Sequence, residues 1–280
     1  MPRSYILAFT VILFFFSSFS SEAAAQLSSL NDDPMPMSLR ELQSIEKESM
    51  LPVESDVLPL DIRRDAVEEA ALSYGARGGL AWRTFNIRQE LEERASYLDK
   101  IYDFRQLLIP APSGLLIEPP IISEAQDAML IEANGLNAAV ADTVFNINRN
   151  ARIVSAPRTW RVYLERQWGE ILPPPDILRP ANKEERQIWE NLVEKGWKSG
   201  IEQADEIFQS DLNRLLADYQ GMIRYRTLLA QGMVSPPNAQ QIDRGVTGGG
   251  NEMRVGDRAL TITNLPELQP RYDQWKPANR

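Results

Sequence analysis

The stretch ALSYGARGGLAWR, residues Ala71–Arg83, places three glycines inside a helical pattern that begins near Asp61, a good N-cap residue. Gly75, Gly78 and Gly79 each cost about 1 kcal/mol in a helix interior, so helix propensity does not explain them. Glycine has no Cβ and therefore lets another backbone come close, or it allows a kink. The stretch predicts a helix that closely approaches a neighbour or bends here.

Apolar residues after this stretch keep helical spacing. Leu91, Ala95, Leu98 and Tyr102 recur at intervals of four, three and four residues and so form one stripe. This stripe predicts a helix that packs on the core.

The longest helical pattern starts at Asn182, a cap residue followed three positions later by Glu185, and runs to about Gln231. Its apolar residues lie mostly on one face, and the opposite face alternates in charge, as a solvated surface does. Glycines inside the pattern predict a bend or a division into two shorter helices; they are Gly196, Gly200 and Gly221.

A change of period separates these helical patterns. Prolines within residues 110–120 end helicity, and residues 139–147 alternate between apolar and more polar side chains. A turn signal, Asn134-Gly135, precedes the alternation. Together they predict a small antiparallel β element over residues 129–154, followed by helix-like spacing from 160 to 168.

Residues 252–263 read as two strands joined at Gly256-Asp257, because glycine at the first turn position favours a two-residue hairpin. The predicted fold is therefore α+β and mostly helical, with a small antiparallel β element and a C-terminal β-hairpin.

The N-terminus has the pattern of an export signal. Arg3 precedes an apolar run, and Ala23-Ala24-Ala25 supplies the small residues that signal peptidase recognises. Cleavage after Ala25 would leave Gln26 first. An uncleaved membrane anchor is the alternative, but the run is shorter than the roughly 20 residues that a bilayer span needs.

The rest of the chain divides by composition. Residues 1–25 form the expected signal peptide, and residues 26–60 are rich in Ser, Pro, Asp and Glu without a sustained period, which predicts a flexible N-terminal arm. Residues 61–268 carry the helical and β patterns and form the expected domain. Residues 269–280 form a proline-punctuated C-terminal tail.

Composition excludes several classes of chemistry. The 280 residues include no histidine and no cysteine, which excludes the usual zinc sites, Ser-His-Asp triads and thiol nucleophiles. The formal net charge is −9, and the sequence shows no basic patch in which Lys and Arg could neutralise the phosphates of a nucleic acid. We therefore expect no cofactor, no metal, no small-molecule substrate and no direct contact with nucleic acid.

Carboxylates are the remaining candidates for catalysis. Adjacent pairs such as Glu92-Glu93 point about 100° apart on a helix and cannot flank one bond, so they predict solvated helix faces. A pair assembled from distant segments leaves an exported, cell-wall-active hydrolase as an alternative function. The cluster Gly248-Gly249-Gly250 lacks the lysine of a phosphate loop and predicts a flexible hinge instead.

Six sequence blocks stand out in chain order: ALSYGARGGLAWR (Ala71–Arg83), LDKIYDFRQLL (Leu98–Leu108), TWRVYL (Thr159–Leu164), WKSGIEQA (Trp197–Ala204), GMIRYRTLLAQGMVSPP (Gly221–Pro237) and DRALTIT (Asp257–Thr263). Together they closely resemble the DotC family. That family is a component of the Dot/Icm type IVB secretion apparatus, and its counterpart in I-complex conjugative plasmids is called TraI. The resemblance covers residues 61–268.

The resemblance implies a non-enzymatic structural subunit of an outer-membrane core complex. Members of the family are lipoproteins that, with the small lipoprotein DotD, help bring DotH to the outer membrane and build a ring-shaped cap. We therefore expect DotD-like and DotH-like partners and self-association in a ring. The cysteine that carries the lipid in the family is absent here, so the expected location is the periplasm, held peripherally at the outer membrane by partners alone.

Two sets of residues are candidates for subunit contacts. Trp82, Trp160 and Trp197 lie in the family-like blocks, where interface anchoring and core packing explain them equally well. The C-terminal hairpin is the second set, because a two-stranded hairpin is marginal alone and docks on another sheet or subunit. Its candidate residues are Gly248, Gly249, Gly250, Val255, Leu260 and Ile262.

A stand-alone periplasmic binding protein is a third possible function, beside the structural subunit and the exported hydrolase.

Overall fold

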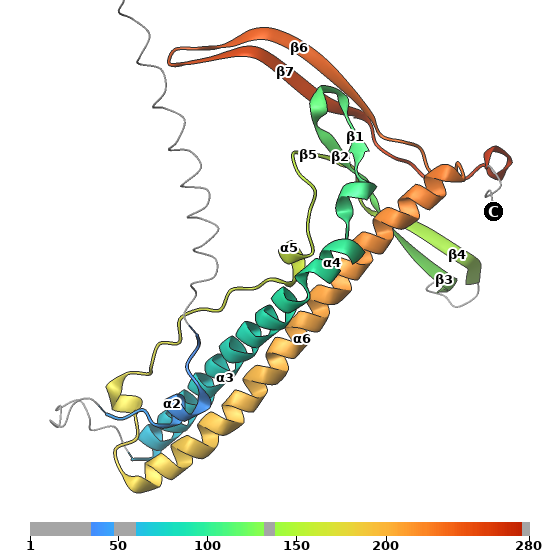
Figure 1. Ribbon diagram of the computed structural model, residues 1–280. Helices are drawn as coiled ribbons and strands as arrows, with labels where there is room; N and C mark the ends of the chain where they lie inside the picture. The colour runs from blue at the N-terminus through green and yellow to red at the C-terminus, as the bar shows by residue number, and fades with distance from the viewer. Residues whose placement is uncertain (1–34, 48–59, 132–137, 276–280) are drawn as a thin grey trace, which may run out of the picture. The chain divides into compact units, whose positions relative to one another are not determined.

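The structure is a computed structural model that describes residues 35–47, 60–131 and 138–275. Its elements confirm the α+β class, with long helices, small antiparallel sheets and a C-terminal hairpin (Figure 1). The described residues divide into two compact units, one that takes in those up to residue 85 together with 169–200, and one that takes in those of 86–168 together with those from 201 onward.

The two long helices, α3 and α6, contribute residues to both units. The described helices are α2 (Leu39–Gln43), α3 (Leu60–Glu93), α4 (Ala95–Ile101), α5 (Arg161–Leu164) and α6 (Lys183–Ala230), with 3-10 turns η3 (Phe104–Leu107), η4 (Pro112–Gly114), η5 (Asp176–Leu178) and η6 (Tyr272–Gln274). The described strands are β1 (Ile109–Pro110), β2 (Leu116–Glu118), β3 (Ile121–Ile131), β4 (Ala138–Arg149), β5 (Arg152–Val154), β6 (Asn238–Gly249) and β7 (Glu252–Asn264). None of these helices is long and apolar enough to serve as a membrane span within the residues that the structure describes.

In the first unit, glycines of α3 lie against the backbone of α6. A Cβ added at Gly75 would collide with the carbonyl oxygen of Val193, and one added at Gly79 would collide with that of Trp197. Only glycine fits at these two positions, because the obstacle is main chain and cannot rotate away. The predicted close approach of this helix to a neighbour is confirmed.

Glycines of α6 meet α3 in the same way. A Cβ at Gly196 would collide with the carbonyl oxygen of Leu72, and one at Gly200 with that of Ala76. The contact positions advance together along both helices, so α3 and α6 run parallel in this unit. Each helix thus presents two glycines four residues apart, the spacing that lets two helix backbones approach most closely.

Helix α2 packs onto the same unit. Ser38 and Glu41 form a capping box, in which the Glu41 carboxylate accepts a hydrogen bond of 2.6 Å from the Ser38 backbone N–H. Leu42 is fully buried next to Gly78, and its carbonyl accepts a hydrogen bond of 3.3 Å from the Trp189 indole. The flexible-arm prediction for residues 26–60 does not anticipate this folded part.

The core of the second unit combines helices from distant parts of the chain. Leu91 is buried there, and Ala95, Leu98 and Tyr102 pack against the same core, so the predicted stripe is confirmed. The buried members are Ile87, Leu91, Phe104, Leu107, Ile121, Trp160, Tyr163, Leu164, Leu215 and Met222.

The long C-terminal helical pattern forms a single helix. Of the two predicted alternatives, a bend or a division into two shorter helices, the division is wrong, because α6 runs unbroken from Lys183 to Ala230. Its glycines serve close packing instead, since Gly221 lies against Ile121 and Ile122 of β3. The predicted cap is confirmed, because Asn182 Oδ1 accepts a hydrogen bond of 2.8 Å from the Glu185 backbone N–H.

Two shorter elements differ from prediction. Strand β3 begins at Ile121, well before residue 129, because a register shift between Ile121 and Ile122 lets two consecutive apolar residues be buried and hides the alternation. The helix-like spacing over residues 160–168 gives only α5, whose C-cap Glu165 is already extended. The Asn134-Gly135 turn lies outside the described residues.

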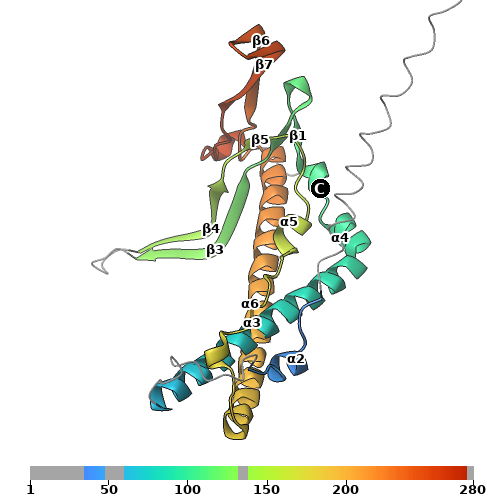
Figure 2. The same cartoon turned by 90° about the vertical axis from the view of Figure 1, so that its left-hand side faces the viewer.

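Three antiparallel sheets are formed by the described strands, with strand orders β1-β2-β5, β3-β4 and β6-β7 (Figure 2). We call β3–β4 the middle ribbon and β6–β7 the C-terminal ribbon. A C-terminal hairpin was predicted correctly, but its turn was not: the strands are joined at Gly250-Asn251. Gly256 has a φ of 72° and lies at a register shift inside β7, so its left-handed conformation serves a bulge rather than a turn.

Candidate functional site

A half-buried arginine, Arg158, joins two buried carboxylates in the second unit. Glu118, at the end of β2, is only 2% exposed, and it accepts a hydrogen bond of 2.9 Å from Arg158 Nε and a second one from Arg158 Nη2. Arg152 of β5 donates a third hydrogen bond, of 3.1 Å, to the same carboxylate. Such charge-assisted, two-pronged pairs are the strongest hydrogen bonds that proteins form.

The same guanidinium reaches the second carboxylate, that of Asp218 in α6. Arg158 Nη1 donates to Asp218 Oδ2 at 3.1 Å and to the Tyr163 hydroxyl oxygen at 2.8 Å. The Tyr163 hydroxyl in turn donates a hydrogen bond of 2.7 Å to Asp218. Arg149 donates two more hydrogen bonds to the Asp218 carboxylate, of 3.2 and 3.4 Å. We call these six residues the Arg158 cluster: Glu118, Arg149, Arg152, Arg158, Tyr163 and Asp218.

The Arg158 cluster ties the small β elements to helix α6. Arginines donate to both of its carboxylates, whereas a glycosidase pair needs one carboxylic acid that can give up a proton. The arrangement is typical of a structural ion-pair network and not of an acid–base pair.

Two buried tyrosines in this unit have raised pKa values. Burial, reinforced by the hydrogen bond to Asp218, raises the pKa of Tyr163 to about 12. Burial also raises the pKa of Tyr225 to about 12, and its hydroxyl has no hydrogen-bond partner among the described residues.

These values predict a loss of stability at alkaline pH. A tyrosine that ionises near pH 10 when unfolded and near 12 when folded contributes its full stability below pH 10 and loses it as the pH rises to 12. We expect the Tyr225→Phe variant to be as stable as the unaltered chain at pH 8, and to lose about 1–3 kcal/mol less between pH 10 and 12. Urea unfolding at pH 8, 10 and 11.5 measures both. A clear loss at pH 8 would mean that the hydroxyl has a partner.

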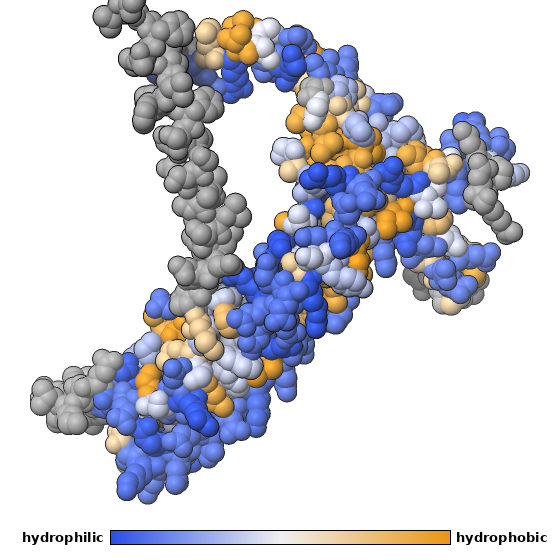
Figure 3. Space-filling view, in the orientation of Figure 1, coloured by the Kyte–Doolittle hydropathy of each residue, from blue (hydrophilic) through white to orange (hydrophobic). Residues whose placement is uncertain are grey.

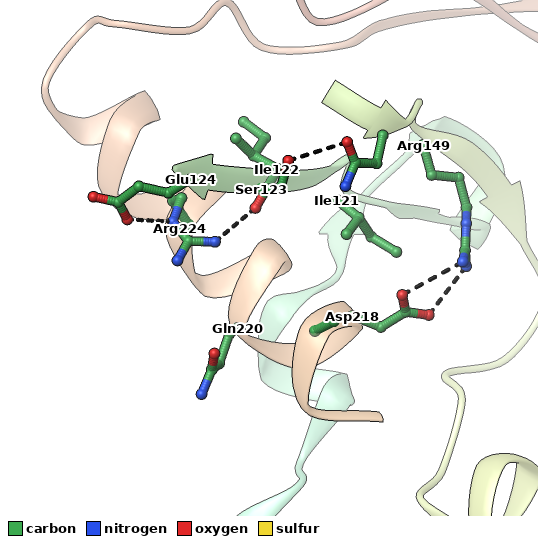
Figure 4. A pocket seen from close by; sticks show the side chains of 10 residues that line it. Ile121, Ile122, Ser123, Glu124, Arg149, Asp218, Gln220 and Arg224 are labelled. Atoms are coloured by element: carbon green, nitrogen blue, oxygen red, sulfur yellow. Dashed lines mark hydrogen bonds and ion pairs between the residues drawn. The ribbon is translucent and has the colours of Figure 1, made fainter. Parts of the chain in front are cut away.

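A groove of about 380 Å³ opens beside the cluster, between β3, the end of β4 and α6 (Figure 4). Arg224 donates to Glu124 at 2.8 Å and to the Ile122 carbonyl at 2.7 Å, while Arg149 faces Asp218. Both arginines of the lining are paired with carboxylates. Neither therefore supplies a free cation to an anionic ligand.

The tryptophans predicted as interface or core residues prove to be largely core. Trp160 is buried and donates to Asp99 at 2.7 Å, and Trp197 is buried next to the half-buried Trp82, with ring centroids 5.7 Å apart. Core packing, one of the two explanations open from the sequence, accounts for Trp160 and Trp197. Ala25 and Gln26, the predicted cleavage site, lie outside the described residues.

The candidate residues of the C-terminal ribbon lie on its two strands and at its tip. Gly248 and Gly249 end β6, and Gly250 forms the turn with a φ of 63°, so the predicted hinge ahead of the hairpin is wrong. Val255 is exposed, and Leu260 and Ile262 are half-buried. Figure 3 shows hydrophobic residues on this ribbon among hydrophilic ones.

At the base of the C-terminal ribbon, the segments just before β6 and just after β7 are hydrogen-bonded to each other. Val234 and Leu268 form a β-bridge, and Ser235 N–H donates to the Glu267 carbonyl at 3.0 Å. Beyond this base, β6 also contacts η4. The ribbon is therefore anchored at its base, while its strands expose apolar residues such as Val255.

The Arg158 cluster was not anticipated from the sequence. Its members are separated by up to 100 residues, from Glu118 to Asp218, and a network of arginines and buried carboxylates leaves no local spacing pattern. In the ranges that the structure describes, no group of three or more acidic residues is placed to hold a metal ion.

Comparison with known proteins identifies one family. Residues 61–277 match the family model described as type IV secretory system, conjugal DNA-protein transfer, which carries the name TraI. The match takes in both helices of the glycine contact, the Arg158 cluster and both ribbons. No curated protein matches the chain.

Proposed function

We propose, because the chain belongs to the TraI family of type IV secretory system components, that it is a non-enzymatic structural subunit of an outer-membrane core complex. In this role it assembles with a DotD-like and a DotH-like subunit, helps to place the latter at the outer membrane, and associates with itself in a ring. The family match over residues 61–277 is the observation that carries the proposal.

The structure supports a scaffolding role in two ways. The Arg158 cluster fixes the small sheets to α6 through ion pairs instead of presenting acid–base groups. Two antiparallel ribbons, of 11 and 12 residues and of 12 and 13 residues, expose side chains that a subunit can use to reach a neighbour.

The location follows from the same proposal. We propose that the chain is exported with cleavage between Ala25 and Gln26, and that it is held peripherally at the outer membrane through its partners. Expression without the DotD-like and DotH-like partners, followed by membrane fractionation, tests this. Recovery with the outer membrane in their absence would contradict it.

Affinity purification tests the subunit role. The C-terminally tagged chain is purified from its native host in mild detergent, and the proteins that co-elute in a large particle are identified by mass spectrometry. We expect DotD-like and DotH-like subunits in that particle. A chain that elutes alone as a monomer would contradict the proposal and favour a stand-alone binding protein, and peptidoglycan turnover by that monomer would favour the hydrolase.

The C-terminal ribbon can be removed with little disturbance. Because Val234 pairs with Leu268 below it, residues 239–262 can be replaced by a two-residue Asn-Gly turn. We expect the variant to keep its helical circular dichroism signal and to lose the large particle in the same purification. A variant that still enters the particle would show that the ribbon is not an interface, and a lost helical signal would place it in the core.

A further inference from the structure

The three glycines of α3 face two different neighbours. Gly75 and Gly79 lie against the main chain of α6. A Cβ added at Gly78 would instead collide with the Cδ1 atom of Leu42 in α2, and it would come within 3.2 Å of the Trp197 ring. Glycine lowers the stability of a helix, and at Gly78 the missing side chain leaves a notch that one leucine of the N-terminal arm fills.

Polar groups of the first unit donate to the main chain of the segment that fills this notch. The indole N–H of Trp189 donates a hydrogen bond of 3.3 Å to the Leu42 carbonyl. Arg179 Nη1 donates one of 3.2 Å to the Glu46 carbonyl. Trp189 and Arg179 are both buried. A notch for one side chain, together with donors to main-chain carbonyls, is a recurring way to recognise a peptide segment.

These groups come from α3, from α6 and from the segment between them. The Tyr74 hydroxyl completes the set, because it lies 3.8 Å from the Met37 sulfur. We call the set the Leu42 site; its residues are Tyr74, Gly78, Arg179, Trp189 and Trp197.

The segment in the Leu42 site, residues 35–47, caps its own helix. Ser38 and Glu41 satisfy each other's backbone N–H groups at the start of α2, so the first unit supplies no cap. Pro36 and Leu42 are the buried residues of the segment, and Met35 at its start is 69% exposed. The segment therefore contacts the unit mainly through one leucine and its own main chain.

The two long helices are held together by contacts in which the segment takes no part. At each of four glycines, the atoms nearest to an added Cβ belong to the other long helix; they are Gly75, Gly79, Gly196 and Gly200. Arg179 also donates a hydrogen bond of 3.0 Å to the Pro174 carbonyl, which does not involve the segment. Removal of the segment would leave all of these contacts in place.

We propose that the first unit is a receptor for the chain's own N-terminal arm: the Leu42 site is a peptide-binding site, and residues 35–47 are its separable ligand. This goes beyond the subunit role and does not depend on it. The site takes a short helical segment with a leucine at the position of Leu42 and holds the rest by two main-chain carbonyls. While residues 35–47 are bound, no other segment of this chemistry can enter.

A peptide added to the whole chain tests the proposal. Leu42→Asp places a charge in the apolar notch, so it should release the segment while the helical circular dichroism signal persists. A peptide of residues 35–47, labelled with fluorescein at the exposed Met35 end, should then bind the Leu42→Asp chain saturably in fluorescence anisotropy. The unaltered chain should bind it at least about tenfold more weakly, because its own tethered segment competes at a high effective concentration.

Gly78→Ala, added to the Leu42→Asp chain, is the matched variant. The new Cβ takes the place of the leucine Cδ1 atom, so the peptide should bind about tenfold more weakly or worse. A second peptide that carries Leu42→Ala leaves room for this Cβ, and it should bind the Gly78→Ala variant better than the leucine peptide does. Without Gly78→Ala the order of the two peptides should be reversed, and a general loss of stability cannot produce such a reversal.

The remaining outcomes would overturn the proposal. Loss of the helical signal in the Leu42→Asp chain would show that the segment is part of the core and is not a separable ligand. A folded Leu42→Asp chain that does not bind the peptide, or that binds both peptides alike with and without Gly78→Ala, would show that the Leu42 site does not recognise the segment. The assay uses the purified chain alone, so no result of it bears on the proposed subunit role.

Discussion

The Gly200→Ala variant is expected to lose about 2–3 kcal/mol of unfolding free energy, although alanine is the better helix former. Alanine in a helix interior gains about 1 kcal/mol over glycine from backbone entropy. A collision between the new Cβ and the carbonyl oxygen of Ala76 in α3 costs more than this gain. Because the obstacle is main chain, the two helices must move apart and lose contacts along their length.

Urea unfolding of Gly200→Ala and of a matched control gives the answer. Gly169 has nothing within 4 Å of an added Cβ, so Gly169→Ala in the same unit should change stability by no more than about 0.5 kcal/mol.

A second test combines Gly200→Ala with Gly79→Ala. Helices already separated by one substitution should tolerate the second at less than its full cost. Equal or greater stability of Gly200→Ala would show that the close contact does not hold the unit together.

Removal of the shared arginine is expected to have the largest effect. Arg158→Met should destabilise the chain by about 3–5 kcal/mol, because Glu118 and Asp218 remain buried and lose their common partner. An exposed pair sets the scale for comparison. Arg64 is 68% exposed and bonds to Glu68 at 3.0 Å, so Arg64→Met should cost less than about 1 kcal/mol.

Neutralising the two carboxylates shows whether Arg158→Met loses stability through their buried charge or through the lost packing of the guanidinium. Glu118→Gln and Asp218→Asn added to Arg158→Met should recover part of the stability, since the penalty comes mainly from two buried carboxylates that each keep only one arginine, Arg152 and Arg149. If the triple variant is less stable than Arg158→Met, the packing of the guanidinium itself accounts for the loss. Thermal and urea unfolding at pH 7 of the unaltered chain, Arg158→Met, Arg64→Met and the triple variant measure these differences.

Much of the helical structure could be predicted from the sequence because its signals are local. The cap formed by Asn182 and Glu185, the stripe through Leu91 and the close approach at Gly75 all appear in the structure as expected. Glycine was interpreted less well inside α6. A glycine such as Gly196 can indicate a break in a helix or a place where another helix packs closely. Here it allows close packing, and only the position of the partner helix α3 distinguishes the two.

The hairpin and the ion-pair cluster show why the rest could not be predicted. Gly256 gives a correct signal for positive φ, but that conformation serves a bulge, and strand β7 finds its partner in residues 238–249, which show weak alternation. Glu118, Arg158 and Asp218 come together only when the chain is folded. Sequence spacing contains no record of contacts between such distant segments.

The discontinuity of the first unit has a consequence for how the chain folds. Its two parts, the described residues up to 85 and residues 169–200, are separated by the whole stretch 86–168, and the parallel contact of α3 with α6 requires both parts. During synthesis the glycine face of α3 at Gly75 and Gly79 therefore lacks its partner until the first turns of α6 have emerged. Closing so long a loop carries an entropic cost before any contact repays it, so this unit is expected to be late and slow to form. Until then the side of α3 that lies against α6 stays uncovered.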